Sequence, residues 1–197
     1  MIAFIFLEIF NNLKCYYICI YIYIGKAPPR GTTVELAHID VPPNMNLWPL
    51  FHNGVAAGLR IHPDASNIDS TWIVYNKQQQ GEFGIEHSGF LMALGLNGHL
   101  KNLAPYSMYE YLVECHEATN VGLLLGLSAT HRGTMNVSMT KLLSLHVETL
   151  LPPTSIELNV PQNVQVAALM GVGLVYQGTA HRHISHALLS EIGNYLI

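Results

Sequence analysis

The sequence has 197 residues, of which 50% are hydrophobic and only 11% are charged, and its formal net charge is −4. Typical soluble domains carry about 25% charged residues, so such a chain either enters a membrane or has its surfaces covered by further protein. Its nine Lys and Arg residues are scattered along the chain, which argues against nucleic acid or anionic lipid as a partner. Cys15, Cys19 and Cys115 form no CxxC pair, so neither a disulfide framework nor a zinc site is indicated, and we expect a reducing compartment.

Residues 1–25 form an atypical apolar segment. Polar residues such as Glu8 and Lys14 divide it into runs shorter than the roughly 20 residues that a bilayer needs. It also lacks a basic leader region and a small-residue cleavage site. Three interpretations stay open: translated non-coding sequence, which fits the repetitive CIYIYI best, a targeting or anchoring segment, and a genuine strand.

The segment 26–46 is predicted to be an extended, proline-rich linker. Pro28, Pro29, Pro42 and Pro43 lie in it, and proline together with the residue before it disfavours helix. We therefore expect ordered packing to begin near Leu47.

Four short stretches rich in small residues follow, and they align with one another without gaps. They begin at residues 54, 89, 122 and 167 and read GVAAGL, GFLMALGL, GLLLGLSA and AALMGVGL. The spacings are 35, 33 and 45 residues, and spacings of this size are typical of helical repeat arrays.

Two positions of this alignment carry small residues in every copy. Residues four apart share one face of a helix, and small side chains there let neighbouring helix backbones approach closely. Eleven residues after the first position, glycine matches again in the last two copies, although Leu100 breaks the match in the second; glycine there suits the left-handed residue that ends a helix. The predicted structural-repeat residues are Gly54, Gly89, Gly122 and Ala167; Gly58, Ala93, Gly126 and Gly171; and Gly133 and Gly178.

A second segment with helical apolar spacing follows the later copies, beginning at Ser107, Val137 and Ile184. The last of the three spacings is longer, and the polar, proline-bounded stretch 152–163 accounts for the extra length as an inserted loop. Residues 47–197 are therefore predicted to form about four helical hairpins, truncated at the C-terminus. The fold class predicted is all-α, built of α-α helical repeats.

The repeats resemble proteasome/cyclosome repeats, and longer words such as APPRGTTVEL, FHNGVAAGL and GLVYQGTAHRH are similar to the family of large scaffold subunits of the anaphase-promoting complex. The resemblance covers about Lys26 to Gly193. It implies a partial toroid or solenoid that acts as a non-catalytic scaffold in a multi-subunit ubiquitin ligase controlling mitosis. It also implies no cofactor, a nuclear and cytoplasmic location, and other subunits of that complex as partners, including a co-activator and the co-receptor for destruction motifs. Family members are far longer, and four repeats cannot close a ring.

Competing chemical motifs are weak. HEATN, from His116, lacks the second histidine of a zinc protease, and GVGLVYQG, from Gly171, departs from the spacing of a dinucleotide fingerprint. His181, His183 and His186, with His131, could ligate a metal, but structural histidines are the favoured interpretation. No GxSxG elbow occurs. We therefore predict no catalytic, cofactor-binding or metal-binding residues, and neither a nucleic-acid partner nor a small-molecule substrate.

The predicted partner contacts are loops, because loops carry recognition on solenoids. They are residues 152–163 and the turns 130–135 and 178–183. Two interpretations from outside this scaffold family stay open: a scaffold fragment of the proteasome regulatory particle, and a small membrane-anchored helical protein that uses residues 1–24.

Overall fold

The computed structural model describes residues 46–76, 84–114, 116–151 and 159–194, which belong to the unit Ile39–Ile197. These residues form helices joined by turns, and they contain no strand. The prediction of an all-α repeat fold is thereby confirmed. The predictions for residues 1–25, and for the linker apart from Asn46, lie outside the described residues.

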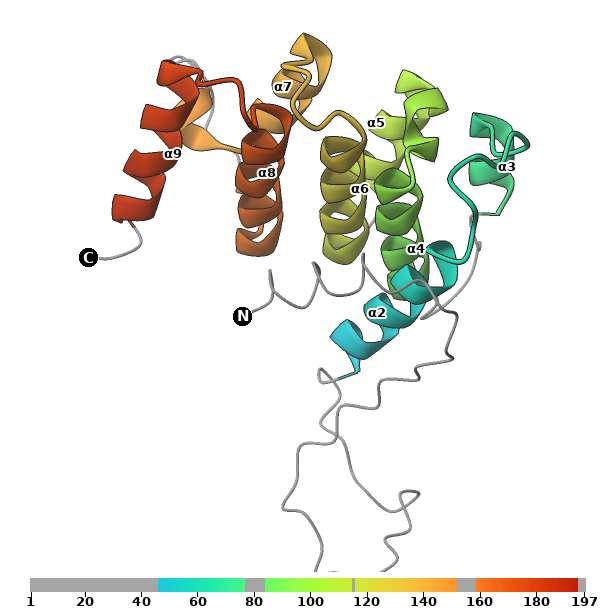
Figure 1. Ribbon diagram of the computed structural model, residues 1–197. Helices are drawn as coiled ribbons and strands as arrows, with labels where there is room; N and C mark the ends of the chain where they lie inside the picture. Colours follow the sequence, from blue (N-terminus) through green and yellow to red (C-terminus); the bar gives the residue numbers. More distant parts are fainter. Residues whose placement is uncertain (1–45, 77–83, 115, 152–158, 195–197) are drawn as a thin grey trace, which may run out of the picture. The chain divides into compact units, whose positions relative to one another are not determined.

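Four helices carry the small-residue stretches, and we call them the inner helices. They are α2 (Leu47–Gly58), α4 (Gly84–Leu96), α6 (Glu117–Thr130) and α8 (Gln162–Val175). Each packs along its length against the next, α2 on α4, α4 on α6 and α6 on α8. Figure 1 shows α4, α6 and α8 as neighbouring helices side by side.

A second, shorter helix follows each inner helix, and we call these the outer helices. They are α3 (Ser70–Tyr75), α5 (Pro105–Glu114), α7 (Val137–Ser144) and α9 (Arg182–Asn194). Single-turn 3-10 helices, η2 (His99–Asn102) and η3 (Glu148–Leu150), add to the connections. Side chains fix two of the starts: Asp69 accepts a hydrogen bond of 2.8 Å from the Trp72 amide at α3, and Asn136 one of 3.1 Å from the Met139 amide at α7, which satisfies amides that lack helical partners.

The third outer helix is shorter than its apolar pattern suggests. Helical spacing continues to Leu151, yet α7 ends at Ser144. The His146 amide donates to the Leu143 carbonyl rather than to that of Leu142, and the His146 ring Nδ1 lies 3.1 Å from the Leu142 oxygen instead. The side chain thus takes the place of the helical hydrogen bond, and the chain turns.

The core runs between the inner helices. Leu91 and Leu94 of α4, Leu123 and Leu124 of α6, and Val172 of α8 are fully buried. Burying each such side chain stabilises the fold by about 1.5–3 kcal/mol. Because α4 and α6 each have an inner helix on two sides, they bury apolar residues around most of their circumference, which explains why their sequences show little polar face.

Candidate functional site: the helix interfaces and the turn edge

The interface between α2 and α4 is a reciprocal glycine contact. A methyl group on Gly54 would overlap the backbone carbonyl of Glu86, and one on Gly89 would overlap the backbone carbonyl of Phe51. One turn further along, a methyl group on Gly58 would lie 2.6 Å from the methyl carbon of Ala93. The two backbones are therefore in direct contact, and larger side chains would force them apart.

The interface between α4 and α6 repeats this arrangement. A methyl group on Gly122 would overlap the carbonyl oxygen of Ser88, and one on Gly126 would lie 2.9 Å from the carbonyl oxygen of Leu91. Gly95 also belongs here, since its added methyl group would meet the backbone of Gly126. The alignment of copies did not select Gly95, because the other copies have Arg60, Ser128 and Gly173 at that position.

The interface between α6 and α8 is less tightly restricted. Ala167, at the first repeat position, is 2% exposed and so carries a buried methyl group. A methyl group on Gly171 would meet the Ser128 hydroxyl and lie 2.9 Å from Leu143 Cδ2. The facing atoms here belong to side chains, which can move more easily than backbone.

The glycines after α6 and α8 have left-handed backbones, with φ of 67° at Gly133 and 74° at Gly178. L-residues pay a steric cost in this conformation, whereas glycine does not. The Gly133 amide donates a hydrogen bond of 3.0 Å to the Leu174 carbonyl at the end of the next inner helix. The turn after α6 is thereby fastened to α8.

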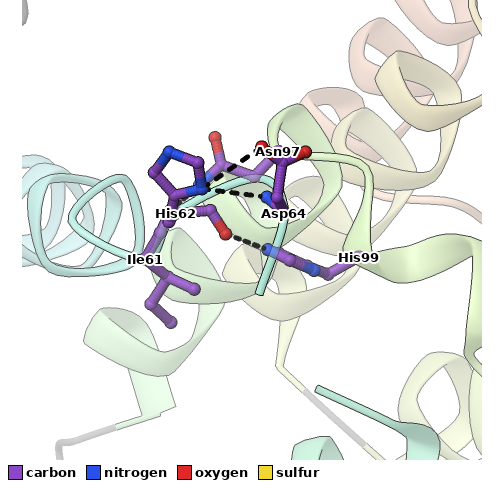
Figure 2. A network of polar contacts seen from close by, with 5 residues as sticks. All are labelled: Ile61, His62, Asp64, Asn97 and His99. Atoms are coloured by element: carbon purple, nitrogen blue, oxygen red, sulfur yellow. Dashed lines mark hydrogen bonds and ion pairs between the residues drawn. The ribbon is translucent and has the colours of Figure 1, made fainter. Parts of the chain in front are cut away.

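Hydrogen bonds also join each earlier turn to its neighbour. Asn97 donates a hydrogen bond of 2.8 Å to the Ile61 carbonyl, and the His99 ring Nε2 lies 3.1 Å from the His62 carbonyl oxygen. Figure 2 labels these residues and marks the contact between His99 and His62. Thr130, at the same repeat position as Asn97, donates a hydrogen bond of 2.7 Å to the Gly95 carbonyl. Sequence reasoning missed these contacts, and the polar residues at one repeat position, Asn97 and Thr130, were the available signal.

The predicted contact loops are placed as follows. Residues 152–158 lie outside the described residues, and Gln162 and Asn163 are the first residues of α8, so the inserted loop ends two residues earlier than predicted. In the turn 130–135, Thr130 is still helical. In the turn 178–183, Arg182 and His183 already belong to α9.

The histidines considered as possible metal ligands are placed as follows. His131 follows α6, His181 precedes α9, and His183 and His186 are exposed on α9. His116, of the HEATN motif, precedes α6. Within the described ranges, no three His, Cys, Asp or Glu side chains are grouped so that they could hold a metal ion. Burial, and secondarily the charge of Lys101, lowers the pKa of His131 below its usual value.

The structure also bears on the other competing interpretations, a dinucleotide-binding motif and a membrane span. The stretch GVGLVYQG, compared above with a dinucleotide fingerprint, begins inside helix α8, and among the described residues no strand precedes it. Of the helices that the structure describes, none has the length and apolar character to cross a membrane.

Two hollows flank the C-terminal helices: one of about 520 Å³ is lined by Thr149, Arg182, His183, His186, Ala187 and Ser190, and one of about 260 Å³ lies between His146 and Glu191.

Stacked helical hairpins with glycine-lined inner helices define the class of this protein: it is an α-α helical repeat protein. Family models identify it more narrowly. Residues 11–132 match the model described as APC1 fourth domain, and residues 137–196 match APC1 fifth domain. The chain therefore belongs to the anaphase-promoting complex subunit 1 family, which confirms the resemblance seen in its sequence. The first match begins inside the apolar segment 1–25.

Relatives from distant eukaryotes share this similarity. Anaphase-promoting complex subunit 1 of Homo sapiens is 64% identical over 171 residues, which are 86% of this chain and 9% of the relative. The protein of the same name from Dictyostelium discoideum is 51% identical over 162 residues, 82% of this chain and 7% of the relative. A "Negative regulator of mitosis" from Emericella nidulans is 45% identical over 166 residues, 84% of this chain and 8% of the relative. The chain thus spans less than a tenth of the length of each of these three relatives.

Proposed function

We propose that this chain is a non-catalytic scaffold segment of the anaphase-promoting complex, a multi-subunit ubiquitin ligase that controls mitotic progression. The observation that carries the proposal is the 64% identity to a subunit of that complex over 86% of this chain. In this role the segment holds other proteins at fixed positions, while ubiquitin transfer is carried out by other subunits.

The helix interfaces support a positional role. Gly54 and Gly89 bring α2 and α4 into backbone contact, and Gly122 does the same for α4 and α6. Contacts between backbones leave little freedom for one helix to slide along another, because no flexible side chain lies between them. We propose that the ten structural-repeat residues serve this purpose, and that each inner helix with the outer helix after it is one repeat, about four in all.

The partners proposed are the other subunits of the complex, including the co-activator and the co-receptor that binds destruction motifs. The location proposed is nuclear and cytoplasmic, as part of that complex. Solenoids of stacked helices present extended surfaces for such partners, and their turns are the parts most free to vary in sequence.

Affinity purification tests this proposal. The chain is expressed with a tag in cells of its source, and co-purifying proteins are identified by mass spectrometry. We expect ubiquitin-ligase subunits with the wild-type chain. We expect their loss with Gly122→Val, which would separate α4 from α6, and their retention with Gly173→Ala, whose added methyl group would have only Leu188 Cδ1 nearby, at 4.0 Å. Recovery of the wild-type chain without ligase subunits would refute the scaffold function.

A further inference from the structure

The fold gathers positive charges that are scattered along the sequence. Among the described residues, four of the five Lys and Arg side chains lie in a turn after an inner helix or on the first residue of an outer helix. These four are Arg60, Lys101, Arg132 and Arg182, and the fifth, Lys141, lies within α7. All four side chains are exposed.

Negative charges in the described part lie mainly elsewhere. Glu86 and Glu117 are in the first turns of α4 and α6, at the opposite end of the inner helices, and Glu110, Glu114 and Glu191 lie in outer helices. Glu148 begins η3 and, with Glu191, lines the hollow of about 260 Å³. Two carboxylates, Asp64 and Asp69, lie in the connection after α2, and Asp69 is occupied in capping α3. The turns 97–104, 131–136 and 176–183 contain cations and histidines and no acidic residue.

These three acid-free turns are neighbours in space. Thr130, at the end of α6, donates to the Gly95 carbonyl, and the Lys101 charge is close enough to act on His131. Arg132 Nε donates a hydrogen bond of 2.6 Å to Gln177 Oε1 in the last turn. We call the surface formed by Lys101, His131, Arg132, His181, Arg182 and His183 the basic turn edge.

The basic turn edge continues into a hollow on α9. Arg182 and His183 line the hollow of about 520 Å³ together with His186, Ser190 and Thr149. Every one of these five side chains can donate a hydrogen bond, and the described lining residues include no carboxylate. A negatively charged side chain that follows the edge would therefore meet further donors at its end.

We infer that the basic turn edge is a docking surface for an acidic segment of a partner protein. This inference deepens the proposed scaffold function and rests on it. The guanidinium and ammonium groups come from successive repeats, so they suit carboxylates spread along a polypeptide. A nucleic acid, with a phosphate every few ångströms, requires a denser basic face than three fixed cations on a chain of net charge −4 provide.

Direct binding tests the inference. The full chain is titrated with a fluorescently labelled oligoglutamate peptide, and the affinity is measured by anisotropy at low and at physiological salt. Lys101→Gln and Arg182→Gln each remove one positive charge from the edge. Gln162→Glu is the matched control, because it changes the net charge by the same amount at the first residue of α8, the other end of that helix.

We expect each of the two edge variants to weaken peptide binding about two- to fivefold, the range that exposed ion pairs give, and we expect added salt to weaken the wild type most. Gln162→Glu should bind as the wild type does. Equal weakening by all three variants, or no binding of the peptide at low salt, would overturn the inference. Tighter binding of a single-stranded oligonucleotide or of phosphatidylserine vesicles than of the peptide would also overturn it. In any of these cases, if the wild-type chain still co-purifies with ligase subunits, the docking inference is wrong but the scaffold function is retained.

Discussion

The hydroxyl of Ser88 on α4 lies 2.9 Å from the hydroxyl of Thr119 on α6, and both side chains are buried. Ser88 Oγ also bonds to the carbonyl of Gly84, one helical turn earlier. Ser88 has one proton and donates it to that carbonyl, so Thr119 is the donor between the two helices. This polar contact therefore lies beside Gly122, where the same helices meet through their backbones.

Removing one member of this pair should cost more than removing both. Ser88→Ala is expected to lower the free energy of unfolding by about 1–3 kcal/mol, because it leaves the Thr119 hydroxyl buried without this acceptor. Adding Thr119→Val, which keeps the shape of the side chain, should recover part of that loss. Urea denaturation of the two single variants and the double variant measures the coupling, and additive effects would contradict this account.

Glycine substitutions should separate packing from helix propensity. Gly122→Ala is expected to destabilise the chain by about 1–3 kcal/mol, because the methyl group would overlap the Ser88 carbonyl. Gly173→Ala makes the same chemical change in a helix, but its nearest neighbour is 4.0 Å away, so it should stabilise the chain by about 0.5–1 kcal/mol. Thermal unfolding followed by circular dichroism compares them, and a similar gain in both would show that helix propensity alone decides the outcome.

The turn after α8 offers a test of backbone strain. Gly178 has φ 74° and Ala180 has φ 52°. Gly178→Ala should lower stability by about 1 kcal/mol, since an L-residue is unfavourable there. Ala180→Gly relieves the same kind of strain but increases the freedom of the unfolded chain, so we expect a gain below about 1 kcal/mol. Chemical denaturation gives both values, and the prediction fails if the two changes have the same sign.

The chain should become less stable as the pH decreases, because of His146. Burial lowers its pKa below the usual value of 6.5, although its hydrogen bond with the Leu142 carbonyl acts in the opposite direction. The unfolded chain then binds a proton more readily than the folded chain, so the contribution of neutral His146 is complete above about pH 6.5 and is lost as the pH falls through the lower, folded pKa. His146→Gln should reduce the drop in melting temperature between about pH 7.5 and about pH 5. His186→Gln, an exposed change on α9, is the control, and an equal reduction by both would argue against His146.

The sequence predicted the fold class because its signal is local. Residues four apart, such as Gly54 and Gly58, share a helix face whatever surrounds them. What faces them is a tertiary property: the alignment could not show that Gly54 meets the Glu86 carbonyl, nor that Gly95 meets Gly126. The end of α7 was missed for a similar reason, since apolar spacing continues past Ser144 while the His146 side chain replaces the helical bond.

The partners in the contacts between turns could not be predicted from the sequence, although polar residues at one repeat position, Asn97 and Thr130, mark where such contacts occur. They join residues more than thirty positions apart, such as Thr130 and Gly95 or Arg132 and Gln177. Each depends on the rotation of one helix pair against the next, which apolar periodicity does not encode. The gathering of Lys101, Arg132 and Arg182 at one edge has the same origin, because cations that are distant in the sequence become neighbours only once the helices are stacked.

Each inner helix packs chiefly on the inner helix before it and the one after it, which makes the stack a series of joints. A change of a few degrees at one joint, for example where Gly122 meets Ser88, is carried undiminished to everything beyond it. Two proteins bound on either side of that joint would keep all their own contacts with the stack, but their orientation relative to each other would change. A substitution in this segment can therefore make an assembly inactive by changing the angle between two bound proteins, while the affinity of each for the stack is unchanged.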